Sequence, residues 1–199
     1  MPARRTVTSV RAEMKTAAAA PIFGFALGWG AKYLHRTFGV AQAEVGHYLW
    51  LPPLAFDAGA ILIGDLASRQ RRPHGAPPRL LFASSIGPAA SLALLPLAET
   101  PWHAVALLGT AMAGGGALYT LITSDLLARM PAGSVSFASG IMAGAQSLAL
   151  IVLNPLIGLA VDHTQSYAGV TVAVGLWAIP GSLIWLAWRP APRLIVGGR

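Results

Sequence analysis

The chain has 199 residues, of which 55% are hydrophobic and only 11% are charged, compared with roughly 25% charged residues in ordinary soluble domains. A water-soluble protein needs charged surface to cover its core, so this composition argues against a soluble fold. The net charge of +7 comes from basic clusters between long apolar stretches, which indicates a membrane protein with basic loops and no nucleic-acid partner. Cysteine is absent, which excludes disulfides, a thiolate nucleophile and cysteine-ligated metals.

Six apolar stretches are long enough to cross a membrane. A helix rises about 1.5 Å per residue, so a hydrocarbon core of about 30 Å requires roughly 20 residues. Between a basic segment at 1–15 and a basic tail at 189–199, the predicted helices cover residues 16–34, 45–67, 80–98, 102–126, 137–161 and 167–188. The sequence therefore predicts an all-α integral membrane protein, a bundle of six transmembrane helices surrounded by the lipid bilayer.

The lysines and arginines predict the orientation of this bundle. If the amino terminus is cytoplasmic, twelve basic residues flank the helices on the cytoplasmic side, and two, Lys32 and Arg36, lie on the other side. Cytoplasmic loops of membrane proteins carry such an excess of basic residues. Because an even number of crossings returns the chain to its starting side, we expect both termini in the cytoplasm of a bacterial-type inner membrane.

The first predicted helix contains polar and aromatic residues near its outer end. Lys32 either attracts an anionic substrate or extends along the helix to reach water at the interface. Tyr33 lies next to it and is included among the expected substrate contacts.

Glycines predict close packing between the helices. Two lie four residues apart in the first helix and two in the fifth, and three are consecutive in the fourth. They are Gly24, Gly28, Gly140, Gly144 and Gly114 to Gly116.

Asp57 lies near the middle of the second predicted helix, where a charged side chain costs about 2.5–3.5 kcal/mol. Pro52 and Pro53 precede it and predict an interrupted helix, which is tolerated at membrane depth where it lines a cavity. A carboxylate beside such a break suits proton coupling. The alternative is a structural acid that is protonated or hydrogen-bonded to a neighbouring helix. Trp50 is the interfacial aromatic residue expected to reach inward toward a substrate.

The fourth and fifth predicted helices each carry a pair of polar side chains on one face. Tyr119 and Thr123 are four residues apart, and Gln146 and Asn154 are eight apart. The hydroxyls would contact a polyol or a sugar acid, and the amides would bind carboxylate or hydroxyl groups. Hydrogen bonding between helices is the alternative role for both pairs.

Catalytic patterns are absent from the sequence. It contains no G-x-S-x-G nucleophile turn, no H-E-x-x-H metal motif and no Walker-type phosphate loop. We therefore expect neither enzymatic activity nor a metal or cofactor.

One segment near the end of the second predicted helix is more specific. It resembles the G-x-L-x-D-R-x-G-R-R/K signature of the major facilitator superfamily, which follows the second helix of each six-helix half. The residues in register are Gly64, Leu66, Arg69 and Arg72. Ser68 replaces the acidic fifth residue, and Asp65 lies nearby. Residues 48–59, 118–129 and 155–167 also resemble helices of this superfamily, most of all its anion:cation symporter branch.

The resemblance covers nearly the whole chain as helices seven to twelve, the carboxy-terminal half of a twelve-helix transporter. It implies a substrate site near the bilayer midplane between two six-helix bundles. It also implies a small organic anion, such as a hexuronate, galactonate or tartrate, that moves together with a proton. The expected partner is a second six-helix half or a second copy of this chain. The alternative is a membrane scaffold or truncated remnant that transports nothing.

Overall fold

The computed structural model describes residues 21–70, 78–129, 133 and 135–187. These residues are almost entirely helical and contain no strand, which confirms the expected all-α class. The predicted segment at 1–15, the first residues of the first predicted helix and the tail at 189–199 lie outside the described residues.

Helices occupy all six predicted stretches, within the part of the chain that the structure describes. The first helix covers residues 21–38 and contains a π-helical segment, η1 (Gly24–Trp29), followed by α2 (Gly30–Phe38). The others are listed in chain order: α3 (Val45–Leu49), α4 (Leu51–Arg69), α5 (Pro78–Leu94) with the 3-10 turn η2 (Leu95–Leu97), α6 (Pro101–Arg129), α7 (Val135–Thr164) and α8 (Ala168–Ala187).

The ends of the first two helices follow from local backbone chemistry. Gly39 adopts a left-handed conformation with φ 68° and donates its N–H to the carbonyl of His35 at 3.0 Å, the usual glycine termination of a helix. The second stretch is divided at Trp50, and α4 then begins at Leu51 with Pro52 in its first turn. Proline is tolerated there because the first-turn N–H groups have no partner within the helix.

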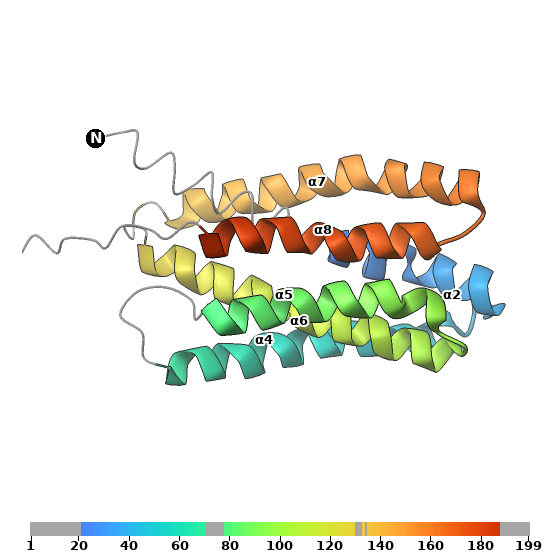
Figure 1. The fold of residues 1–199 in the computed structure, drawn as a ribbon, viewed down its shortest axis with the longest axis horizontal. Coiled ribbons are helices and arrows are strands. Elements are labelled where there is room, and N and C mark those ends of the chain that lie inside the picture. Colours follow the sequence, from blue (N-terminus) through green and yellow to red (C-terminus); the bar gives the residue numbers. More distant parts are fainter. Residues whose placement is uncertain (1–20, 71–77, 130–132, 134, 188–199) are drawn as a thin grey trace, which may run out of the picture.

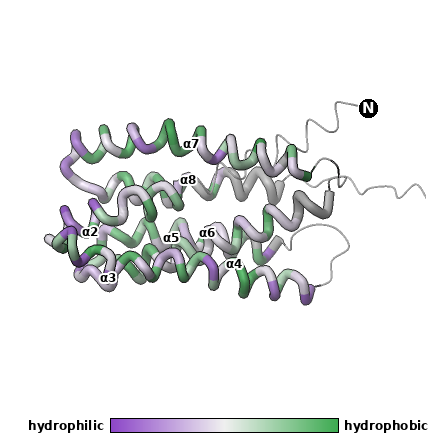
Figure 2. The backbone as a smooth tube through the Cα atoms, turned by 180° about the vertical axis from the view of Figure 1, so that it is seen from behind, coloured by the Kyte–Doolittle hydropathy of each residue, from purple (hydrophilic) through white to green (hydrophobic). Residues whose placement is uncertain are grey.

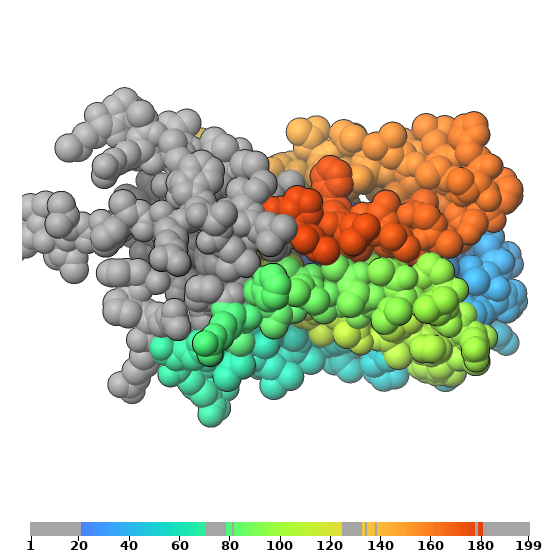
Figure 3. Space-filling view, in the orientation of Figure 1, coloured from blue at the N-terminus to red at the C-terminus, as the bar shows by residue number. Residues whose placement is uncertain are grey.

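The long helices run alongside one another in a single bundle (Figure 1). α6 lies at its centre, packing against α4 on one side and α5 on the other, and α5 packs in turn against α8. α7 lies at the edge and contacts η1 and α8. In the most apolar 18-residue window of each helix, 61% of α6 is buried, compared with 11% of both the α3–α4 segment and α7. The space-filling view shows α8 and α5 side by side on the front of the bundle (Figure 3).

Glycines let α6 approach its two neighbours closely. A Cβ added to Gly59 of α4 would overlap the carbonyl of Ala113, and one added to Gly116 of α6 would overlap the carbonyl of Phe56. Gly114 is equally close to Pro88 of α5. Such contacts bring helix backbones into van der Waals contact, as the sequence predicts for the glycines of the fourth helix.

The glycines of the first and fifth helices have different surroundings. A Cβ on Gly24 would meet Leu150 of α7 at 2.5 Å, which confirms close packing there. Gly140 and Gly144 have no described neighbour within 4 Å of an added Cβ. The prediction of close packing at these two glycines therefore finds no support among the described residues. Both lie on the face of α7 that carries Gly158, which meets Trp29 of the first helix.

The main core lies toward the end of the bundle where α2 terminates. Phe25 and Tyr33 pack edge-on against Tyr167, with ring centroids 6.3 and 5.4 Å from it. Leu92 of α5 and Leu108 of α6 are fully buried in the same cluster. This core joins the first helix to α5, α6, α7 and the start of α8.

Three helices are long and apolar enough to cross a membrane, judged by length and composition over the described residues: Val45–Arg69, Pro101–Ser124 and Val135–Thr164. Two shorter apolar helices are Phe82–Leu97 and Ala168–Trp177. The hydropathy-coloured tube shows apolar stretches along the middle of the bundle and hydrophilic positions toward its ends (Figure 2).

Candidate functional site

The polar residues singled out in the sequence belong to the first helix, α4, α6 and α7. In Figure 1, α5 and α8 lie in front of α6 and the first helix, so the back of the bundle is formed by the four elements that carry these residues. The first helix contacts both α6 and α7, and α6 contacts α4. The four elements therefore form a continuous layer from the α7 edge to the α4 edge.

Trp29 connects the first helix to α7. Its indole Nε1 donates a hydrogen bond to Oδ1 of Asn154 at 3.1 Å, across 125 residues of sequence. Gly158, one turn further along α7, makes room for the indole: a Cβ there would lie 3.3 Å from Trp29 Cη2. A Cβ on Gly28 would lie 3.8 Å from the Asn154 oxygen. The indole and the amide are thus held between two glycines.

The ammonium group of Lys32 lies 4.5 Å from the centroid of the Trp29 ring, within the range of a cation–π interaction. Trp29 is the last residue of the π-helical segment. A π-turn contains one extra residue, which rotates the following side chains by about 100° relative to an uninterrupted α-helix. The orientations of Trp29 and Lys32 therefore depend on this local irregularity.

Asp57 is exposed on α4, and it forms no hydrogen bond or ion pair with another described residue. The helix interruption predicted beside it occurs earlier, at Trp50, and Asp57 lies within uninterrupted α4. Asp57 and Gly64 are two turns apart and share a face. A Cβ on Gly64 would meet Thr120 Cγ2 at 3.1 Å, so the Asp57 face of α4 adjoins α6.

An aromatic row crosses from the first helix to α6 next to this face. Phe23 meets Phe56 edge-on at a centroid distance of 5.0 Å, and Phe56 lies 6.3 Å from Tyr119. Tyr119 is half-exposed at 47%. One turn further along α6, Thr123 buries its hydroxyl oxygen without a hydrogen-bond partner among the described residues, which leaves a polar group free inside the layer.

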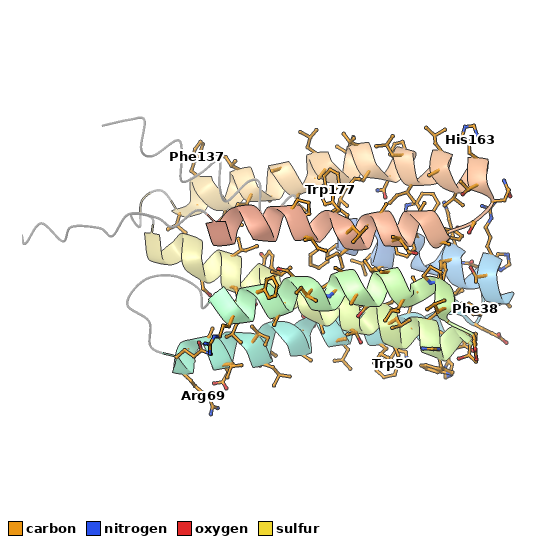
Figure 4. The ribbon with its side chains drawn as sticks, viewed as in Figure 1. Phe38, Trp50, Arg69, Phe137, His163 and Trp177 are labelled. Atoms are coloured by element: carbon orange, nitrogen blue, oxygen red, sulfur yellow. The ribbon has the colours of Figure 1, made fainter. Side chains whose placement is uncertain are left out.

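The remaining predicted site residues lie apart from these contacts. Tyr33 is buried in the core and donates its hydroxyl to the carbonyl of Leu95 at 3.1 Å. Trp50 is 53% exposed at the junction of α3 and α4, and Figure 4 shows it near the outer edge of that region of the bundle. Gln146 is half-buried on α7, about two turns before Asn154.

The segment with the signature-like residues forms the last turns of α4. Arg69 contacts Asp65 Oδ2 through both Nε and Nη2 at 2.8 Å, and Ser68 donates its hydroxyl to the Asp65 carbonyl at 2.7 Å. Asp65 thus pairs with the arginine four residues later on the same helix. Gly64 and Leu66 lie within α4, and Arg72 lies outside the described residues.

Sequence reasoning missed the pairing of Trp29 with Asn154 and the role of Phe23 and Phe56. A usable signal was present for Trp29, because it lies between Gly28 and Gly30 and three residues before the helix's lysine.

Comparison of the chain with protein-family models, curated proteins and solved structures finds no match.

Proposed function

We propose that the chain crosses a membrane six times and forms one half of a proton-coupled transporter for a small organic anion. The observation that carries this proposal is the exposure of Asp57 and Asn154 on α4 and α7, two helices that also expose many large apolar side chains. Asp57 and Asn154 favour contact with water, and the exposed apolar side chains favour contact with lipid. The bundle therefore needs both environments.

The outer surface of the bundle supports its placement in a lipid bilayer. Monomeric soluble proteins rarely expose contiguous apolar patches larger than several hundred Å². Here large apolar side chains project from all the long helices (Figure 4). Examples that are at least 43% exposed are Ile61 and Leu62 of α4, Phe82 and Ile86 of α5, Trp102 of α6, Ile151 and Leu159 of α7, and Leu176 and Trp177 of α8.

The orientation is supported by the distribution of charge at the two ends. Arg69, Arg79 and Arg129 flank the ends of α4, α5 and α6 at one end of the bundle. Lys32 and Arg36 lie toward the opposite end, where acidic groups are also present: Glu44, Glu99 and Asp162. The excess of basic residues at the first end favours a cytoplasmic location for it, with both chain termini on that side.

Transport is supported by the chemistry of the back layer. Asp57 carries the titratable carboxylate, which can bind a proton from one side of a membrane and release it to the other. Asn154 supplies amide donors, and Tyr119 and Thr123 supply hydroxyl groups for a polyhydroxylated acid. A second six-helix bundle placed against this layer would enclose these groups in a cavity, as the resemblance to the major facilitator superfamily suggests. That bundle is a separate chain or a second copy.

The proposal is tested by uptake into liposomes that contain the chain alone or together with a candidate second half. Glucuronate, galactonate and tartrate are supplied under an imposed pH gradient, with the outside acidic. We expect accumulation of at least one of these acids, and its loss when a protonophore dissipates the gradient. Absence of uptake for every acid, in a correctly inserted bundle, would instead favour the scaffold or remnant.

A further inference from the structure

We propose that Lys32 and the side-chain amide of Asn154 form a carboxylate-binding pair, with Trp29 as the positioning residue that orients both. This inference rests on the proposed function for its biological use. The anion site itself can be tested without transport.

The orientation of the Asn154 amide follows from its hydrogen bond. An indole N–H can only donate, so the atom 3.1 Å from Trp29 Nε1 must be the amide oxygen and not the nitrogen. The NH₂ group therefore points away from the indole. No described residue accepts a hydrogen bond from it, which leaves two amide donors available to a ligand.

Lys32 supplies a positive charge without an acidic partner among the described residues. The ion pairs in the described ranges are Arg36 with Asp162 and Arg69 with Asp65. Lys32 lies three residues after Trp29, yet its ammonium group lies over the Trp29 ring. The side chain thus folds back by about one helical turn, away from the nearby helix end at Phe38. A lysine that extends to interfacial water would point toward that end.

These three groups match one class of ligand. An ammonium group and an NH₂ donor complement the two oxygens of a carboxylate. The edge of the indole beside them offers apolar surface to the rest of a small molecule. A single cation suits a monocarboxylate better than a dianionic phosphate ester, which would call for further positive charge.

The surroundings of the indole explain how Trp29 positions the two groups that bind the carboxylate. Gly158 leaves space for the ring on α7, and the Asn154 oxygen takes its N–H. Trp29 therefore contacts both groups: its N–H donates to the amide oxygen, and its ring lies beneath the ammonium group. Phenylalanine at position 29 would keep the ring and lose the hydrogen bond.

The first experiment uses iodide, an anionic quencher of tryptophan fluorescence, and neutral acrylamide as its reference. The full chain is reconstituted in phosphatidylcholine nanodiscs, and the Trp29 signal is the difference between the wild type and Trp29→Phe. We expect Lys32→Gln to lower the constant for quenching of Trp29 fluorescence by iodide by about twofold or more. The constant for quenching by acrylamide should stay unchanged. Arg36→Gln is the matched control, since Arg36 has the partner Asp162.

If Lys32→Gln leaves the ratio of iodide to acrylamide quenching unchanged, or if Arg36→Gln lowers it equally, Lys32 does not form an anion site. Either result overturns the proposal.

The second experiment measures binding of D-glucuronate to the same nanodiscs, with neutral D-glucose as the reference. We expect Lys32→Gln and Asn154→Leu each to weaken glucuronate binding by about tenfold or more, because each removes a charge-assisted contact. Lys32→Arg should retain most of the affinity. Trp177→Phe, which alters an exposed tryptophan of α8, should leave it unchanged.

The positioning role of Trp29 has its own readout. Trp29→Phe should weaken glucuronate binding in the wild-type background and have no further effect in the Asn154→Leu background, because the hydrogen bond is already lost there. Equal effects in both backgrounds would show that Trp29 does not act through Asn154.

Failure of the two proposals can be told apart. Charge-selective binding that depends on Lys32, without uptake of any acid, would contradict transport and retain the site. Uptake that survives in both Lys32→Gln and Trp29→Phe would retain transport and contradict the site.

Discussion

α6 and α7 have almost the same length and are both apolar, with 29 and 30 residues, yet they occupy opposite positions in the bundle. α6 is packed on both sides by α4 and α5, and α7 is an edge helix that contacts η1 and α8. Glycines mark the difference. Those of α6 meet the backbones or side chains of neighbouring helices. On α7, Gly158 meets Trp29, and Gly140 and Gly144 meet none of the described residues. Length and hydropathy identify a candidate membrane span, and helix contacts decide whether it is central.

The largest expected effect concerns the exposed acid of the other edge helix, α4. Asp57→Asn removes the titratable proton, so pH-driven accumulation of the organic anion should be abolished while exchange of anion across the liposome membrane persists. Uptake and counterflow assays on the same liposomes measure the two activities. Asp65→Asn is the matched control on α4, because Asp65 pairs with Arg69 at the helix end. Unchanged accumulation in Asp57→Asn would remove the coupling role.

The next largest effect contrasts the packed and the edge helix directly. Gly116→Val places a side chain against the carbonyl of Phe56, and we expect a loss of about 3 kcal/mol in the free energy of unfolding, the upper end for overpacking. Gly144→Val, with no described neighbour within 4 Å, should change it by less than about 0.5 kcal/mol. Thermal unfolding in detergent compares the two. Similar losses would mean that α7 is packed as tightly as α6.

A smaller effect is expected where α7 is attached to the first helix. Trp29→Phe breaks the hydrogen bond to Asn154 and should lower the free energy of unfolding by about 1 kcal/mol. The exposed Trp177 provides the control substitution, Trp177→Phe, with a change close to zero. If both variants unfold alike, the bond does not hold α7 against the bundle.

The smallest effect concerns the ion pair between the same two elements. Arg36 Nη1 and Asp162 Oδ1 are 3.8 Å apart, and the two side chains are 51% and 71% exposed. Because exposed pairs contribute little and are screened by salt, Arg36→Gln should cost less than about 1 kcal/mol and nothing measurable in 1 M salt. Unfolding at low and high salt measures this. A larger, salt-independent loss would identify the pair as a principal attachment of α7.

Much of the helical framework was predictable from the sequence, because the length and apolarity of a segment are local properties. All six predicted stretches contain helix in the described part of the chain, with ends shifted by a few residues. Irregular backbone was less predictable. The two prolines predicted an interruption beside Asp57, but α4 is continuous there. The division lies earlier, at Trp50, because proline is tolerated in a first helical turn. The π-turn at Gly24–Trp29 packs against α7, where Gly24 meets Leu150, and contacts between such distant segments are not visible in a sequence.

The candidate site was only partly predictable for a similar reason. Asp57 and Asn154 attract attention in a sequence because polar groups are rare inside apolar helices. The contacts that define their surroundings join distant segments. Trp29 meets Asn154 across 125 residues, and Tyr33, predicted near a substrate, instead lies in the core beside Tyr167. Such pairings depend on how helices pack, which hydropathy does not report.

The measurement that tests the central claim most directly is the sidedness of single cysteines, which the cysteine-free chain allows without background. Gln42→Cys and Ser166→Cys lie at one end of the bundle, and Gln70→Cys and Gly133→Cys at the other. In intact bacterial cells, a membrane-impermeant maleimide should label the first two, and label the second two only after permeabilisation. Labelling of all four in intact cells, or a chain that stays soluble without detergent, would contradict a bundle that crosses the membrane with its arginine-rich end inside.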